Sequence, residues 1–218
     1  MLKTLQQYLE RLYELEVGHQ VDDFVITDPK LARLLDDGPD RRDSPEKLLV
    51  RQDDDNLDLS LYLDRAVLDR LQADDPDKSL HRGNLGDFCL ALEGVSHFVY
   101  LLWNVACGRK VTLMELELQA EIDKYMVVSL LMGRQRDGRI PVRLRRWLFD
   151  DPQFDNALKA QALDRYRDAN RYAGKYCSQL EQRYLYRSRR HDNSLLNDVR
   201  QFYRLPLGDK IRRIECPV

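Results

Sequence analysis

Hydrophobic residues recur at helical spacing along much of this chain, and the most apolar stretch lies near its centre, from residue 84 to 107. Only Asp87, Glu93 and His97 can carry a charge there. At about 100° per residue, the apolar side chains share one broad face of a helix. That face consists of Phe88, Ala91, Leu92, Val95, Phe98, Val99, Leu102 and Ala106. A stretch with so few charges predicts a helix that is buried on most sides.

A second helix is expected directly after the turn at residues 107–110. Thr112 and Glu115 fit the capping-box pattern, in which each side chain satisfies the other residue's free backbone N–H. The helical pattern then continues to Gly133. Helices joined by so short a turn are antiparallel neighbours. Residues 84–132 are therefore predicted to form a central helical hairpin.

The polar residues of this second helix fall on two sides of a helical wheel. Glu115, Gln119 and Asp123 lie together, and we expect them to face water. The other polar group shares its arc with apolar residues and is expected to point inward. It consists of Glu117, Glu121 and Lys124.

Together with a narrow polar stripe on the first helix, the inward residues predict a polar cluster between the two helices. The candidate cluster is Glu93, His97, Tyr100, Glu117, Glu121 and Lys124. Unpaired buried charges are costly, so these groups must neutralise one another, reach water in a cleft or bind a ligand. Two interpretations stay open, because both perturb pKa values: a structural ion-pair network, and a ligand or catalytic site with His97 as base.

The spacing of this cluster does not favour a metal. Glu93 and His97 are four residues apart, whereas the helices of dinuclear carboxylate proteins use a spacing of three. Lys124 would also repel a divalent cation. We therefore expect no metal and no cofactor, and the pattern identifies no catalytic residue.

The first third of the chain predicts a mixture of helices and strands. A helix is expected over residues 2–15, a short strand over 23–28 and a brief helix from Pro29 to Leu35. Residues 47–52 and 57–64 flank an acidic turn and predict a β-hairpin. A short helix at residues 66–71 follows. This segment should contain a small antiparallel sheet of two or three strands.

The last third predicts helices. A basic stretch at residues 134–146 carries six arginines and one aspartate. The longest helix should span residues 151–186, and a final one should start near Ser194 and end before Pro206; the residues beyond carry no clear pattern. The fold class is therefore α+β, mainly α, with a helical bundle-like body. We expect one domain over 1–218, with an acidic α/β segment (1–83), the central hairpin (84–132) and a basic helical segment (133–218).

Composition indicates a soluble globular protein, since 43% of the 218 residues are hydrophobic and 33% are charged. No stretch has the pattern of a secretion signal or a membrane span. The four cysteines show no CxxC spacing, which favours reduced thiols in a cytoplasmic protein. They are Cys89, Cys107, Cys177 and Cys216.

Charge divides the chain into two halves. Residues 1–128 hold 15 Lys and Arg against 26 Asp and Glu, whereas residues 129–218 hold 20 against 11. The balances are −11 and +9, which together give the net charge of −2. The basic half could serve an acidic or nucleic-acid partner. Alternatively, the halves face each other, within the fold or in a head-to-tail oligomer.

No local motif identifies an enzyme class, because the phosphate-binding, dinucleotide-binding, nucleophile-elbow and zinc-binding patterns are absent. We therefore expect a protein-binding or scaffold module with a protein partner or a second copy, and no membrane. One alternative is an enzyme or ligand-binding protein that uses the central cluster. Another is nucleic-acid binding by an arginine-rich patch beside tyrosines. That patch consists of Arg183, Arg187, Arg189, Arg190 and His191.

Overall fold

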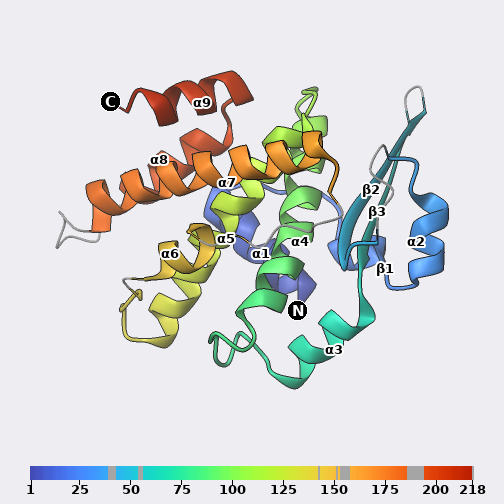
Figure 1. Ribbon diagram of the computed structural model, residues 1–218, viewed down its shortest axis with the longest axis horizontal. Helices are drawn as coiled ribbons and strands as arrows, with labels where there is room; N and C mark the ends of the chain where they lie inside the picture. Colours follow the sequence, from blue (N-terminus) through green and yellow to red (C-terminus); the bar gives the residue numbers. More distant parts are fainter. Residues whose placement is uncertain are drawn as a thin grey trace.

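The computed structural model describes residues 1–38, 43–53, 56–141, 143–150, 152, 158–185 and 194–217. A body of helices occupies one side of the molecule, and a small sheet lies against it (Figure 1). The expected α+β class, mainly α, is confirmed.

The central hairpin is confirmed and consists of α4 (Leu85–Ala106) and α5 (Leu113–Gln135). The capping box is present: the Glu115 N–H donates to Thr112 Oγ1 at 3.2 Å, and the Thr112 N–H donates to Glu115 Oε2 at 3.0 Å. Because these bonds join residues only three apart, they start α5 without help from the rest of the chain.

Helices from both ends of the chain surround α5. It packs against α4, α1 (Leu2–Tyr13), α6 (Leu144–Phe149) and α7 (Ala160–Leu180), and α7 runs across the hairpin in Figure 1. A five-residue π-helical turn, η2 (Glu181–Leu185), extends α7. The expected start of this helix, residues 151–157, falls largely outside the described residues.

The two remaining helices close the body. α8 (Ser194–Tyr203) packs on α1, and α9 (Leu207–Glu215) packs on α7. No element was predicted for α9, a helix of nine residues whose buried positions are Lys210 and Ile214.

The expectation for one polar face of α5 is wrong, because this helix is buried on several sides. Glu115, Gln119 and Asp123 do not face water, since only 4%, 0% and 1% of their surfaces are exposed. A polar stripe on a helix predicts solvent only when no other element covers it. In this protein, other elements cover both the Glu115 side and the Glu117 side of α5.

The sheet has three strands in the order β1-β3-β2. β2 (Glu46–Asp53) and β3 (Asn56–Leu63) form the expected antiparallel hairpin. β1 (Val25–Ile26), after the 3₁₀ turn η1 (Val21–Phe24), runs parallel to β3. The expectation of an antiparallel sheet is therefore wrong for the third strand. A parallel pair needs a crossover, and α2 (Pro29–Leu35) together with β2 provides it.

The sheet packs on α4 with one face and on α2 with the other. Leu61 and Leu63 belong to the main core, whereas Tyr62 packs with Ala32 and Leu49 beneath α2. Gly94 allows the close approach to α4, because a Cβ there would lie 2.8 Å from Leu61 Cδ1 and 3.0 Å from Glu46 Oε1. α3 (Arg65–Ala73) then leads from the sheet toward α4.

α4 is long and apolar enough to cross a membrane by length and composition, contrary to the expectation that no stretch is. In this structure 61% of its most apolar window is buried against other parts of the protein. The core helix of a soluble protein meets the same criteria, so the finding is weak evidence for a membrane span.

Candidate functional site

The expected polar cluster consists of two groups that meet at Glu93, and one predicted residue, Tyr100, lies elsewhere. The first group is centred on Lys124, whose Nζ donates to Glu121 Oε1 at 2.5 Å and to Glu93 Oε2 at 3.0 Å. Burial opposes the charge of this lysine, but Glu121 and Glu93 outweigh it and hold the pKa of Lys124 well above its usual value. Burial raises the pKa of Glu121, which the ammonium partly offsets. The group is a partly buried lysine that forms ion pairs with two carboxylates.

The second group is centred on His97, which lies between two carboxylates. Its Nδ1 is 3.7 Å from Glu46 Oε1, and its Nε2 is 3.6 Å from Glu117 Oε2. Both distances exceed those of ordinary hydrogen bonds. Glu46 did not belong to the predicted cluster, because a single glutamate at the start of a strand carries no periodic signal.

Electrostatics in the second group favour a charged imidazole. Burial acts to lower the pKa of His97, but the carboxylates of Glu117 and Glu46 outweigh it and hold that pKa well above its usual value. Burial also raises the pKa of Glu46, although His97 acts in the opposite direction. In the absence of a bound ligand, His97 is therefore protonated on both ring nitrogens, and its positive charge lies between the two carboxylates.

A cavity of about 240 Å³ opens onto the His97 group. It lies between β2, the segment after α2, the two central helices and α7. Polar side chains along its wall include Glu46, Lys47, His97, Glu117 and Arg165. Arg165 Nε is 3.8 Å from Glu117 Oε1. This half of the cluster is therefore open to small molecules or ions.

Among the described residues, Glu93, His97 and Glu117 offer ligand atoms that all lie within 4.8 Å of one another. One imidazole nitrogen and two carboxylate oxygens form a donor set that suits a divalent transition metal. The sequence expectation of no metal rested on the spacing between Glu93 and His97 and on repulsion by Lys124; the spacing argument does not apply when Glu117 on α5 completes the group, whereas Lys124 does lie beside Glu93.

Tyr100 belongs to a different network, so its assignment to the His97 cluster is corrected. Its hydroxyl accepts a hydrogen bond from Lys210 Nζ at 3.0 Å, and Lys210 also donates to Gln119 Oε1 at 2.7 Å. Lys210 is completely buried. Burial lowers the pKa of Lys210 to about 7, although Asp123 and Glu115 oppose that shift.

Asp123 accepts three hydrogen bonds at the centre of the same network. They come from Tyr13 at 2.5 Å, Ser96 at 2.6 Å and Gln119 at 2.8 Å. Burial raises the pKa of Asp123 to about 6, and these hydrogen bonds limit the rise. Because its polar groups bond one another deep in the core, this network fits a structural role.

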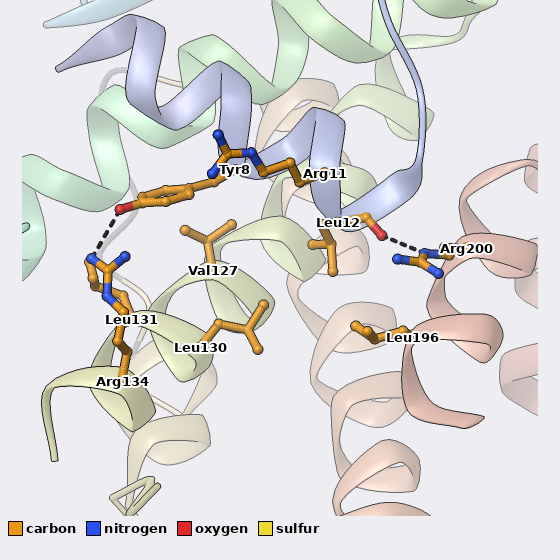
Figure 2. Close-up of a pocket in the computed structure, with 9 residues that line it drawn as sticks. All are labelled: Tyr8, Arg11, Leu12, Val127, Leu130, Leu131, Arg134, Leu196 and Arg200. Atoms are coloured by element: carbon orange, nitrogen blue, oxygen red, sulfur yellow. Dashed lines mark hydrogen bonds between the residues drawn. The ribbon is translucent and has the colours of Figure 1, made fainter. Parts of the chain in front are cut away.

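A second cavity, of about 280 Å³, is lined mostly by apolar side chains, unlike the polar cavity at His97. Figure 2 shows this groove between α1, α5 and α8. Its apolar wall and its arginines come from all three helices: Tyr8, Arg11, Leu12, Val127, Leu130, Leu131, Arg134, Leu196 and Arg200. Leu130 is 47% exposed although most of α5 is buried.

Only one residue of the predicted arginine-rich patch is described. Arg183 lies in η2, where its Nη1 is 3.5 Å from Asp198 Oδ2. Arg187, Arg189, Arg190 and His191 lie outside the described residues. Nucleic-acid binding therefore stays a prediction from sequence.

The geometry thus offers two candidate sites, the His97 cavity and the apolar groove. No family model, curated protein or solved structure matches this chain.

Proposed function

We propose that this protein is a protein-binding module whose groove between α1, α5 and α8 receives an apolar side chain from an acidic segment of a partner protein. The observation that supports this most directly is an apolar groove with arginines from three different helices around it (Figure 2).

The apolar wall supports an anchoring role. A volume of about 280 Å³ is near the lower limit of ligand pockets and suits one or two inserted side chains. Buried apolar anchors in such pockets contribute much of the free energy of protein association. The exposed Leu130 would lose its contact with water when a partner binds, which is favourable.

The arginines support an acidic partner. Arg134 donates to the Tyr8 hydroxyl at 3.0 Å, and Arg200 donates to the Leu12 carbonyl at 2.8 Å, so both guanidinium groups are held at the groove. Arg11 is exposed beside them. Arginine is favoured at interfaces because its planar group pairs with carboxylates and covers apolar surface. Arg200 also pairs with Glu14 at 2.7 Å, and Arg134 lies 3.5 Å from Asp77. The exposed Arg11 therefore supplies most of the charge that favours an anchor flanked by Asp or Glu.

The test uses the full chain and a fluorescent amphipathic peptide with leucines on one helical face and glutamates on the other. We expect fluorescence anisotropy to show saturable binding that weakens with salt, and the same peptide with lysines to bind at least about tenfold more weakly. Leu130→Glu should reduce the affinity at least about tenfold.

Leu113→Glu is the matched control, since Leu113 is also an exposed leucine of α5, at 50%, but does not line the groove. Equal loss of peptide binding in both variants, or no binding by the wild type, would contradict the proposal. If the protein alone self-associates and Leu130→Glu abolishes that self-association, the occupant is a second copy and the proposed partner is wrong.

A further inference from the structure

We propose that Glu93, His97 and Glu117 bind one divalent transition-metal ion, with Glu46 holding the other side of the imidazole ring. The ion would enter through the cavity beside β2. This site lies on different side chains from the apolar groove, so it does not depend on the proposed protein-binding function.

The distances around His97 suit an ion better than direct contact between side chains. Ligands at about 2.1 Å from a tetrahedral ion are about 3.4 Å from one another. The separation of 3.6 Å between His97 Nε2 and Glu117 Oε2 is close to that value and too long for a hydrogen bond. Since the Glu93 oxygen completes a group within 4.8 Å, small side-chain movements bring all three atoms to one ion.

Unsatisfied atoms give a second, independent indication. Within the described part of the chain, neither His97 Nε2 nor Glu46 Oε1 has a hydrogen-bond partner, although both atoms are buried. Leaving such atoms without partners is costly. An ion on Nε2 would satisfy the first, and the Nδ1–H would then point at Glu46, 3.7 Å away. A carboxylate that orients a metal-binding histidine in this way is a recurring arrangement.

Charge balance also favours one divalent ion. With a neutral imidazole, the ion pairs that connect His97, Glu117 and Lys124 involve four carboxylates and two cations, whose charges sum to −2, whereas Lys47 on the cavity wall pairs with Asp36. The carboxylates are Glu46, Glu93, Glu117 and Glu121, and the cations are Lys124 and Arg165. One divalent ion neutralises that charge.

Lys124, which disfavoured a metal at the level of sequence, does not occupy the proposed position. Its ammonium contacts Glu121 Oε1 at 2.5 Å and Glu93 Oε2 at 3.0 Å. A carboxylate has two oxygens, so Glu93 can bind an ion with one and keep Lys124 on the other. The mixed nitrogen and oxygen donors favour Zn²⁺ or Mn²⁺ over Mg²⁺ and Ca²⁺, which prefer oxygen alone.

The experiment titrates Zn²⁺ and Mn²⁺ separately into chelator-treated full-length protein, with calorimetry and thermal unfolding as readouts. We expect one ion per chain and a higher melting temperature in its presence. His97→Ala and Glu117→Gln should each weaken binding at least about 100-fold, and Glu46→Gln by about 10- to 100-fold.

His81→Ala is the matched control, because His81 Nε2 also lies near a carboxylate, 3.2 Å from Asp74 Oδ2, but at the surface. It should bind the ion as the wild type does. Circular dichroism shows whether each variant folds, and Glu117→Gln keeps the side-chain shape if His97→Ala does not fold. The proposal is overturned if neither ion binds saturably, or if folded Glu117→Gln binds as tightly as the wild type.

Discussion

At the scale of single residues, Lys210 is a completely buried lysine. Its ammonium lies 4.5 Å from the centre of the Tyr100 ring and donates to two uncharged oxygens, on Tyr100 and Gln119. Ion pairs within 4.0 Å are absent for this lysine among the described residues, so burial is only partly compensated. Asp123 is nearby and is also buried. These two groups make stability depend on pH.

The first prediction is the shape of that dependence. Lys210 has a pKa of about 7 in the fold and an ordinary value of 10.5 in the unfolded chain, so between these pH values the unfolded chain binds more protons. Stability from this group therefore rises as pH increases from about 7 to about 10.5. Asp123 has a pKa of about 6 in the fold and an ordinary value of 3.8 in the unfolded chain, so its contribution to stability falls as pH increases across that range.

Urea unfolding at a series of pH values measures both effects. Lys210→Met should lack the rise above pH 7, which we expect to be a few kcal/mol in the wild type. Asp123→Asn should lack the fall at acidic pH. Parallel pH profiles for the wild type and Lys210→Met would show that the lysine is not titrating in this way.

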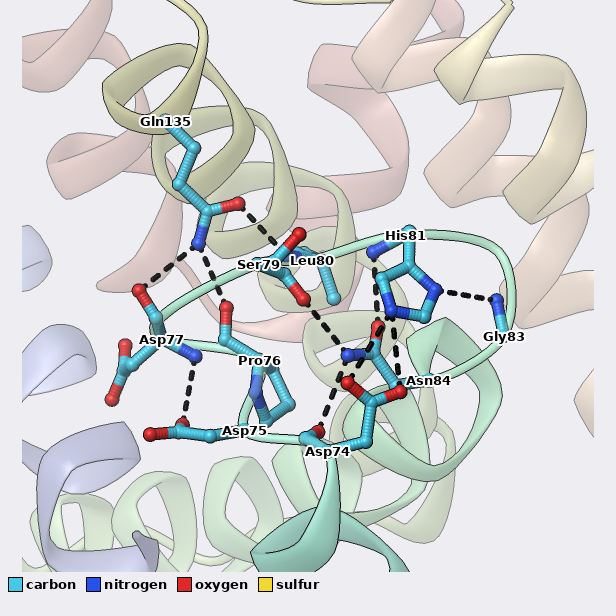
Figure 3. A network of polar contacts seen from close by, with 10 residues as sticks. All are labelled: Asp74, Asp75, Pro76, Asp77, Ser79, Leu80, His81, Gly83, Asn84 and Gln135. Carbon is cyan, nitrogen blue, oxygen red and sulfur yellow. Dashed lines mark hydrogen bonds and ion pairs between the residues drawn. The ribbon is translucent and has the colours of Figure 1, made fainter.

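At the scale of elements, the segment between α3 and α4 depends on two amide side chains (Figure 3). Gln135, at the end of α5, donates to the carbonyls of Pro76 and Asp77 at 2.8 and 3.1 Å and accepts from the Leu80 N–H at 2.8 Å. Asn84 bonds backbone groups of the same segment. This irregular segment is therefore fixed to the C-terminal end of α5.

Gln135→Ala should lower the free energy of unfolding by about 1–3 kcal/mol, because it leaves partly buried backbone groups without partners. Gln182→Ala is the control, since Gln182 is exposed and its hydrogen bond to Ser178, within the part of the chain that the structure describes, is long at 3.4 Å. Urea unfolding of both variants measures the difference. Equal stability of the two would show that water replaces the Gln135 hydrogen bonds.

At the scale of the whole molecule, contacts join the two ends of the chain. Arg200 and Arg204 donate to the carbonyls of Leu12 and Tyr13 at 2.8 and 2.9 Å, at the end of α1. Arg200 also pairs with Glu14 at 2.7 Å, and Arg165 lies near Glu117. Some arginines of the basic half thus pair with carboxylates of the acidic half within the fold.

These contacts predict that the chain unfolds as one unit, as expected for a single domain. Far-ultraviolet circular dichroism follows all helices, whereas tryptophan fluorescence follows Trp103 on α4 and Trp147 on α6. The two signals should give the same urea midpoint. Separate midpoints would show that part of the chain unfolds independently.

Local signals in the sequence were sufficient for several elements of this fold. The capping box starts α5, Pro29 starts α2 after Asp28 caps it, and alternating residues form the β2–β3 hairpin. Each of these depends on residues only a few positions apart or on one short turn. The central hairpin and the mainly helical class followed from the same kind of information.

By itself, the sequence determined helices α1 to α5, α7 and α8, but not α6 or α9, and it determined that His97 and Glu117 would be enclosed. Only the tertiary structure decided that Glu46 joins His97, that Tyr100 pairs with Lys210, that Asp123 is buried and that β1 is parallel to β3. The physical reason is that hydrogen bonds within a helix or a turn join near neighbours, whereas burial and pairing of a charged side chain depend on distant segments that periodicity does not identify.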